Sequence, residues 1–107
     1  MFIFESFPVY LKSESALLRL SSLLKSKNID KDIKDQLRRA STSVILNIAE
    51  GSGKFAKNDK KNFYLIARGS VFECIAILRI LKLQKQIEEN HFSQIYNEYE
   101  EVGKMLS

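Results

Sequence analysis

The sequence contains no tryptophan, one cysteine, one histidine, one proline and four glycines. The single cysteine, Cys74, excludes an internal disulfide framework and a cysteine-rich zinc site, and one free thiol fits a reducing compartment. His91 has no second metal-binding side chain at helical spacing from it, so we expect no metal and no cofactor. Because proline and glycine are scarce, helices can run long.

Two further absences concern membranes and secretion. No apolar run approaches the length of a membrane span, since the longest candidate, residues 75–83, is interrupted by Arg79 and Lys82. The N-terminus lacks the succession of basic, apolar and small residues that is typical of a signal peptide. We therefore expect a cytoplasmic protein that does not associate with membranes.

The length of 107 residues and a hydrophobic content of 45% favour one globular domain, residues 1–107. Apolar residues recur at helical spacing in four segments, at about 8–27, 30–50, 58–83 (or 58–86) and 90–106. Short connections between long amphipathic helices predict an all-α fold, an up-down-up-down antiparallel four-helix bundle. Gly51 is expected to end the second helix in a left-handed conformation. The expected core includes Leu37, Val44, Ile48, Phe63, Ile66, Val71, Ile77, Leu78 and Ile95.

Two polar stripes border the apolar faces of the second and third segments. Helical spacing places the members of each stripe on one face, which predicts a hydrogen-bonded seam between helices or between subunits. The carboxylates of Glu50 and Glu73 could in principle perform acid–base chemistry as a hydrolase. Without a partner histidine or a metal set, however, we expect no catalytic residues and no enzyme activity. The two stripes comprise Arg39, Ser43, Asn47 and Glu50, and Ser70 and Glu73.

Charge is distributed unevenly along the chain. Residues 54–87 carry eight basic and two acidic side chains, whereas residues 88–107 carry one basic and five acidic side chains. The basic side chains near the second turn are interleaved with Phe55 and Tyr64, a pattern that suits phosphates and bases of a nucleic acid. A solubilising charged loop is the alternative interpretation. The candidate binding residues are Lys54, Lys57, Lys60, Lys61 and Arg68.

Two sequence blocks resemble a bacterial family of four-helix-bundle proteins, which includes proteins encoded by intervening sequences of 23S ribosomal RNA genes. The first block is QLRRASTS at residues 36–43 followed by NIAEG at 47–51, and the second is FYLIARGS at 63–70 followed by Glu73. The ending VGKML at residues 102–106 also resembles the family. The similarity covers about residues 30–106, and several polar residues and glycines fall at the expected offsets together.

The resemblance implies a four-helix bundle without known catalytic activity that assembles into ring-like pentamers. The family is related to the accessory variability determinant of diversity-generating retroelements, a basic protein that binds nucleic acid and a reverse transcriptase. We therefore expect a homo-oligomer that binds nucleic acid, RNA in preference to DNA, as an accessory factor of a ribonucleoprotein or retroelement. A reverse transcriptase or another protein is a possible further partner. The alternative is a protein–protein adaptor without a nucleic-acid ligand.

Overall fold

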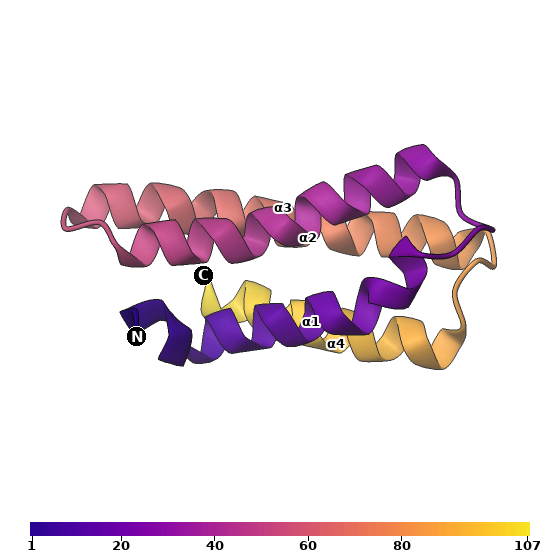
Figure 1. The fold of residues 1–107 in the computed structure, drawn as a ribbon, viewed down its shortest axis with the longest axis horizontal. Helices are drawn as coiled ribbons and strands as arrows, with labels where there is room; N and C mark the ends of the chain where they lie inside the picture. The colour runs from indigo at the N-terminus through magenta and orange to yellow at the C-terminus, as the bar shows by residue number, and fades with distance from the viewer.

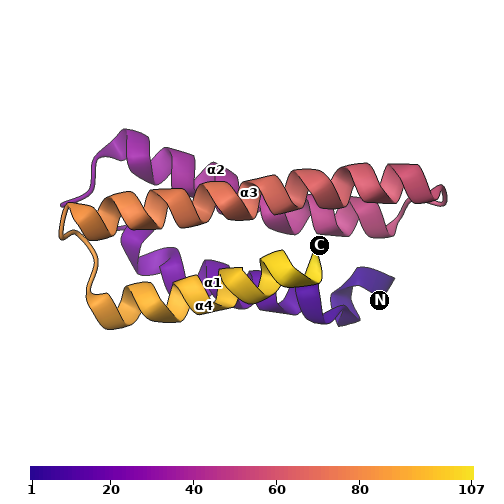
Figure 2. The ribbon, with the colours of Figure 1, turned by 180° about the vertical axis from the view of Figure 1, so that it is seen from behind.

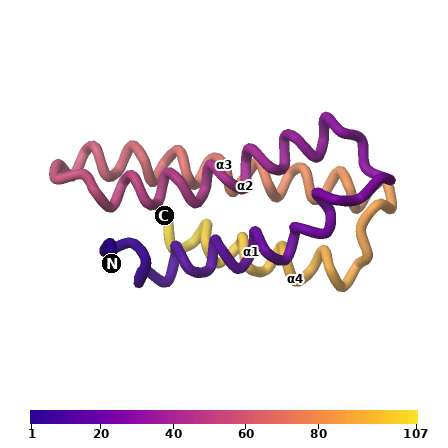
Figure 3. Tube along the Cα trace, in the orientation of Figure 1, coloured from indigo at the N-terminus to yellow at the C-terminus, as the bar shows by residue number.

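A computed structural model describes residues 1–107 and contains helices and no strands. A short 3₁₀ helix, η1 (Ile3–Ser6), precedes four α-helices: α1 (Pro8–Leu24), α2 (Lys31–Ser52), α3 (Lys57–Leu83) and α4 (Glu89–Met105). The chain runs up, down, up and down through the four helices (Figures 1 and 3). The predicted antiparallel four-helix bundle is confirmed. No helix is long and apolar enough to cross a membrane.

The helix ends follow local signals in the sequence. Phe7 is extended and Pro8 occupies the first turn of α1, where its missing N–H costs nothing. At the end of α3, Lys85 is left-handed with φ 58°, and the Gln86 N–H donates to the Leu81 carbonyl at 2.9 Å. This is a Schellman turn, in which a lysine stands where glycine is usual. It reverses the chain into α4.

The predicted role of Gly51 is wrong. Gly51 lies inside α2, is buried and does not have a positive φ. A Cβ atom placed on it would lie 2.7 Å from Cε1 of Tyr64 and 3.1 Å from Cβ of Phe63. Glycine is therefore required here because α3 approaches α2 closely.

The core lies between all four helices and contains 18 buried hydrophobic residues. Seven of the nine core residues expected from the sequence are among them: Leu37, Val44, Ile48, Val71, Ile77, Leu78 and Ile95. Phe63 is only partly buried, and Ile66 is 53% exposed, so its assignment to the core is wrong. Ile66 lies on the outer side of α3, one residue from the buried Ala67.

The α2–α3 hairpin is longer than the α1–α4 pair beneath it. At 1.5 Å per residue, the 27 residues of α3 span about 40 Å, whereas the 17 residues of α1 and of α4 each span about 25 Å. The views from opposite sides in Figures 1 and 2 both show the α2–α3 turn extending past the two chain termini. We call this overhanging part, residues 49–65, the hairpin end.

Candidate nucleic-acid interface

The four candidate lysines all lie at the hairpin end. Lys54 is in the turn, and Lys57, Lys60 and Lys61 occupy the first turns of α3. Helix α3 begins at Lys57, one residue before the expected start at Asn58, and Ala56 occupies the N-cap position without a side-chain hydrogen bond. Three of the lysines are thereby held on a regular helix rather than on a loose loop.

Two of the four lysines make contacts with groups other than carboxylates. The Lys60 ammonium donates to the Ser52 carbonyl at 3.1 Å, which holds the turn closed. The Lys54 ammonium lies 5.1 Å from the centroid of the Phe63 ring, within the range of a cation–π contact. None of the four lysines forms an ion pair, and Asp59 is the one acidic residue between 51 and 72.

Three of the lysines line one hollow below the hairpin end. The hollow has a volume of about 410 Å³, and its wall includes Tyr64 and Leu65 of α3. Leu106 and Ser107 close the hollow on the side of α4. The side chains of Lys57, Lys60 and Lys61 therefore converge on a concave surface that carries positive charge.

Arg68 lies apart from this hollow. Its guanidinium carbon lies 4.7 Å from the centroid of the Phe72 ring, and its buried Nε has no hydrogen-bond partner. Arg68 lines a separate groove of about 230 Å³ between α3 and α4, which also includes Glu100 and Lys104. The structure thus brings the lysines together and places Arg68 farther along the same helix.

The acidic side chains of α4 are largely committed to other helices. Lys12 of α1 pairs with Glu101 at 2.6 Å, and Arg19 of α1 pairs with Glu98. The hydrogen bond to Glu101 raises the pKa of Lys12, and the same bond lowers the pKa of Glu101. Because these pairs join α4 to α1, the negative charge of α4 offsets the positive charge of α1 rather than that of the lysines at the hairpin end.

Three residues of the polar stripes form one hydrogen-bonded group between α2 and α3. The Ser70 hydroxyl donates to Oγ of Ser43 at 2.8 Å, and the Asn47 amide donates to the Ser43 carbonyl and hydroxyl at 2.9 and 3.0 Å. The other three members, Arg39, Glu50 and Glu73, are exposed and make no side-chain hydrogen bond. The hydrogen-bonded seam is therefore shorter than the stripes.

The structure does not bring the two candidate catalytic carboxylates together. Ser43 lies beside Ser70, and Gly51 lies beside Phe63 and Tyr64, which fixes the register of the hairpin. In this register Glu50 and Glu73 are roughly ten residues apart along the hairpin, or about 15 Å. They cannot act on one bond together.

The single histidine and the single cysteine both contact neighbouring parts of the bundle. Nε2 of His91 lies 2.6 Å from the Arg19 carbonyl, a contact between α4 and α1. Cys74 is buried, and burial raises the pKa of its thiol to about 12, so the reactive thiolate is disfavoured. No cluster of three or more histidine, cysteine, aspartate or glutamate side chains could hold a metal ion.

The hydroxyl of Tyr99 is buried in the core, where the Cys74 thiol is its one hydrogen-bonding neighbour. Burial raises its pKa, with a smaller contribution from the neighbouring Cys74. Because a thiol is a weak hydrogen-bond partner and offsets little of the cost of burying a hydroxyl, we expect Tyr99→Phe to increase the free energy of unfolding by about 1 kcal/mol. Urea denaturation followed by circular dichroism measures the change. A loss of stability would show that the contact with Cys74 outweighs the cost of burying the hydroxyl.

A second hollow at the hairpin end was missed in the sequence. It has a volume of about 390 Å³ and is lined by Phe2, Ile3 and Phe4 of the N-terminal segment and by residues from Ala49 to Lys54. The Glu5 carboxylate accepts a hydrogen bond from the Phe2 N–H at 2.7 Å, which stabilises η1. The apolar, aromatic run before Pro8 could have indicated this hollow, because its residues do not follow the spacing of a helix that buries them.

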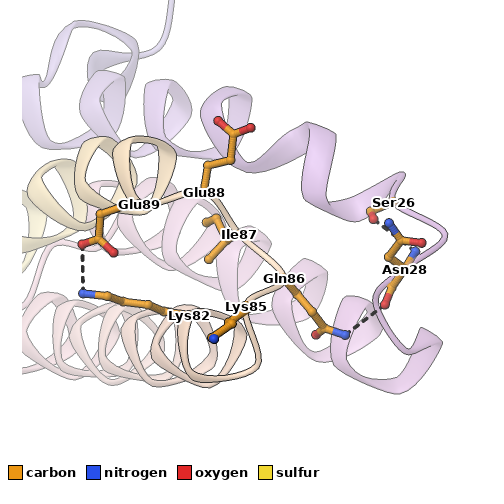
Figure 4. Close-up of a pocket in the computed structure, with 8 residues that line it drawn as sticks. All are labelled: Ser26, Asn28, Lys82, Lys85, Gln86, Ile87, Glu88 and Glu89. Carbon is orange, nitrogen blue, oxygen red and sulfur yellow. Dashed lines mark hydrogen bonds and ion pairs between the residues drawn. The ribbon is translucent and has the colours of Figure 1, made fainter.

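The largest hollow lies at the opposite end of the bundle, between the α1–α2 and α3–α4 connections (Figure 4). Its volume is about 640 Å³, and its charges are mixed. Lys82 pairs with Glu89 at 3.1 Å, and the Gln86 amide donates to the Asn28 carbonyl at 3.0 Å. Because its lysine and glutamate side chains offset one another, this hollow lacks the uniform charge of the hairpin end.

Comparisons with known proteins agree with the fold. The family model described as 23S rRNA-intervening sequence protein matches residues 5–107. A solved structure of a protein of unknown function from the S23 ribosomal protein family of Bacteroides thetaiotaomicron superposes with a TM-score of 0.86 at 26% identity, covering 92% of this chain and 94% of that one. Among curated proteins, none is significantly similar. Since the match extends over nearly the whole sequence, the chain belongs to the 23S rRNA-intervening sequence protein family.

Proposed function

We propose that the protein is a non-enzymatic, oligomeric, cytoplasmic module that binds nucleic acid, with RNA preferred, at its hairpin end. The observation that carries the proposal is the set of four lysines that gather there without a carboxylate partner. Ammonium groups on a rigid helix, free of ion pairs, can replace the counterions of phosphates. The description of the family, which refers to intervening sequences of 23S rRNA, supports RNA as the ligand.

The outer face of α3 supports self-association. A stripe of apolar and small residues runs along α3 from Leu65 to Leu83. Its positions are offset by two residues, about 200° of rotation, from those of the core-facing stripe. The large side chains in it are 40–78% exposed, and a continuous exposed apolar surface is typical of an interface. We call it the α3 stripe; it comprises Leu65, Gly69, Phe72, Ala76, Ile80 and Leu83.

A pentameric ring, as implied by the resemblance to family members, would strengthen binding. Each subunit carries one hairpin end, so the ring presents the basic surface several times. A nucleic acid held by one subunit meets the others at high effective concentration. Weak electrostatic contacts then add up to appreciable affinity without a sequence-specific contact.

Replacing three lysines tests the proposal. We expect the Lys57→Ala, Lys60→Ala and Lys61→Ala triple variant to bind an RNA oligonucleotide about tenfold more weakly at moderate salt. The slope of log affinity against log salt concentration should also become about 2–3 units less steep, since each lost phosphate contact removes nearly one counterion. Fluorescence anisotropy with labelled RNA and DNA measures both effects.

The matched control replaces Lys25, Lys27 and Lys85 at the opposite end of the bundle, which removes the same charge. Equal weakening in both triple variants would indicate an effect of net charge alone. If the wild type binds no nucleic acid even at low salt, the alternative function, a protein–protein adaptor, replaces this proposal. The hydrogen bond of Lys60 to Ser52 makes a folding control by circular dichroism necessary.

A further inference from the structure

Aromatic rings project from the hairpin end into solvent. Phe55 is 101% exposed and sits in the turn between Lys54 and Lys57. Phe2, on the other side of the turn, is 74% exposed and lines the hollow that Lys54 also lines. Phe55 contributes nothing to the core, so folding does not account for a phenylalanine at this position.

The two hollows flank the turn and differ in character. One is lined by Lys57, Lys60 and Lys61 with Tyr64, and the other by Phe2 and Phe4 with Lys54. At about 410 and 390 Å³, each falls within the size range of sites for small molecules or single nucleotides. Each hollow therefore combines aromatic and ammonium groups.

A double helix can contact the lysines of this surface but cannot stack on its aromatic rings. The bases of a duplex are stacked on one another, so a protein ring in solvent meets phosphates and groove edges but no free base face. The bases of an unpaired strand can stack on phenylalanine or tyrosine, while the phosphates contact lysines. The combination of exposed rings and lysines free of ion pairs is thus the chemistry of single-strand recognition.

We propose that the ligand of the hairpin end is single-stranded nucleic acid, with one base stacked on Phe55 and neighbouring nucleotides in the two flanking hollows. This inference rests on the proposed function and specifies its substrate class. Recognition is tolerant of base identity, since every base has a π face. A paired helix binds the same lysines more weakly, because it leaves Phe55 unused.

An anionic membrane is the competing ligand for exposed aromatic and basic side chains. The two hollows beside the turn are concave, however, whereas a membrane-bound segment presents one continuous apolar face. Single-stranded nucleic acid is therefore the better match.

The absence of tryptophan permits a direct test. A Phe55→Trp variant carries a single tryptophan, whose fluorescence is quenched when a base stacks on the indole. We expect quenching by a single-stranded oligonucleotide of uniform sequence and much less by a hairpin duplex of equal charge. The matched control is Leu18→Trp, which places the single tryptophan at a 74% exposed position on α1, where no quenching is expected.

A second measurement uses the affinity. Phe55→Ala should weaken single-strand binding by roughly 5- to 100-fold, the range found for one lost base-stacking contact, and leave duplex binding within about twofold. Phe55→Tyr should retain binding. Since Phe55 is fully exposed, these changes leave the fold intact.

The possible failures are distinguishable. Binding of both nucleic acids with equal affinity, and without an effect of Phe55→Ala, overturns the single-strand inference and leaves the proposed function standing. Binding of neither overturns both. A third outcome, membrane binding, is tested by measuring the fluorescence of the Phe55→Trp variant with vesicles of phosphatidylserine and phosphatidylcholine. Blue-shifted, enhanced indole fluorescence with these vesicles, without quenching by oligonucleotide, would make the surface a membrane contact and overturn the inference.

Discussion

A Phe72→Glu, Ala76→Glu double variant is expected to be a monomer at the micromolar concentrations at which we expect the wild type to be an oligomer. Both residues are exposed, and they lie in the middle of the α3 stripe, one helical turn apart. Burial of an uncompensated carboxylate in an apolar subunit contact costs about 3–5 kcal/mol, and Arg68 beside Phe72 can offset only one of the two new charges. The association constant should fall by at least 100-fold. Light scattering coupled to size-exclusion chromatography reports the mass.

The fold of the single chain should tolerate these changes, because neither side chain contributes to the buried core. Like charges one helical turn apart cost only a few tenths of a kcal/mol on a solvated helix. The matched control is Leu18→Glu with Ser22→Glu, which introduces the same charges with the same spacing on the exposed face of α1. A wild type that stays monomeric across the micromolar range would refute self-association.

Replacing Gly51 by alanine should destabilise the fold by about 1–3 kcal/mol. The new methyl group would lie 2.7 Å from Cε1 of Tyr64 and 3.1 Å from Cβ of Phe63. The Tyr64 ring can rotate away, but Cβ of Phe63 is fixed by the backbone, so α2 and α3 must separate locally. Each kcal/mol lowers the melting temperature of a domain of this size by about 4–8 °C. Thermal denaturation followed by circular dichroism measures the change.

The control is Gly103→Ala in α4. There the added Cβ would lie 3.7 Å from Cγ1 of Val71, which is an ordinary contact. Removing glycine from a helix interior should therefore stabilise the protein by about 0.5–1 kcal/mol. The two substitutions are chemically identical and should have opposite signs. A stabilising Gly51→Ala would mean that the hairpin helices are farther apart than described. Because oligomerisation affects melting, both variants are compared at one protein concentration.

Much of the fold could be predicted from the sequence because helical periodicity is a local signal. The stripe Leu37, Val44 and Ile48 predicted the buried face of α2 and is buried. Ile66 could not be assigned correctly from the same signal. The third helix carries apolar residues on two opposite faces, and spacing alone does not show which face meets the core. Only the packing against α2 and α4 decides that Ala67 is buried and Ile66 is not.

Gly51 shows a second limit of sequence reasoning. A glycine near a helix end favours a left-handed stop, yet here it permits a close approach of two helices. Both interpretations require glycine. The sequence does not show whether glycine is needed for a left-handed backbone conformation or for lack of space for a side chain. The same holds for the site. The lysines could be found from charge alone, whereas the contribution of Phe2 and Phe4 depends on how η1 folds back toward α2.

The α1–α4 contacts also bear on the order in which the bundle assembles. Helices α2 and α3 are joined by a four-residue turn, so their pairing closes only a short loop. The contacts that join α1 to α4, such as Lys12 with Glu101 and the Arg19 carbonyl with His91, connect residues at opposite ends of the sequence. Closing the longer loop costs more chain entropy. The long hairpin is therefore the natural folding nucleus, and α1 and α4 dock on it late. We therefore expect the α1–α4 pair to separate first in sub-global unfolding, while the buried middle of the α2–α3 hairpin stays formed.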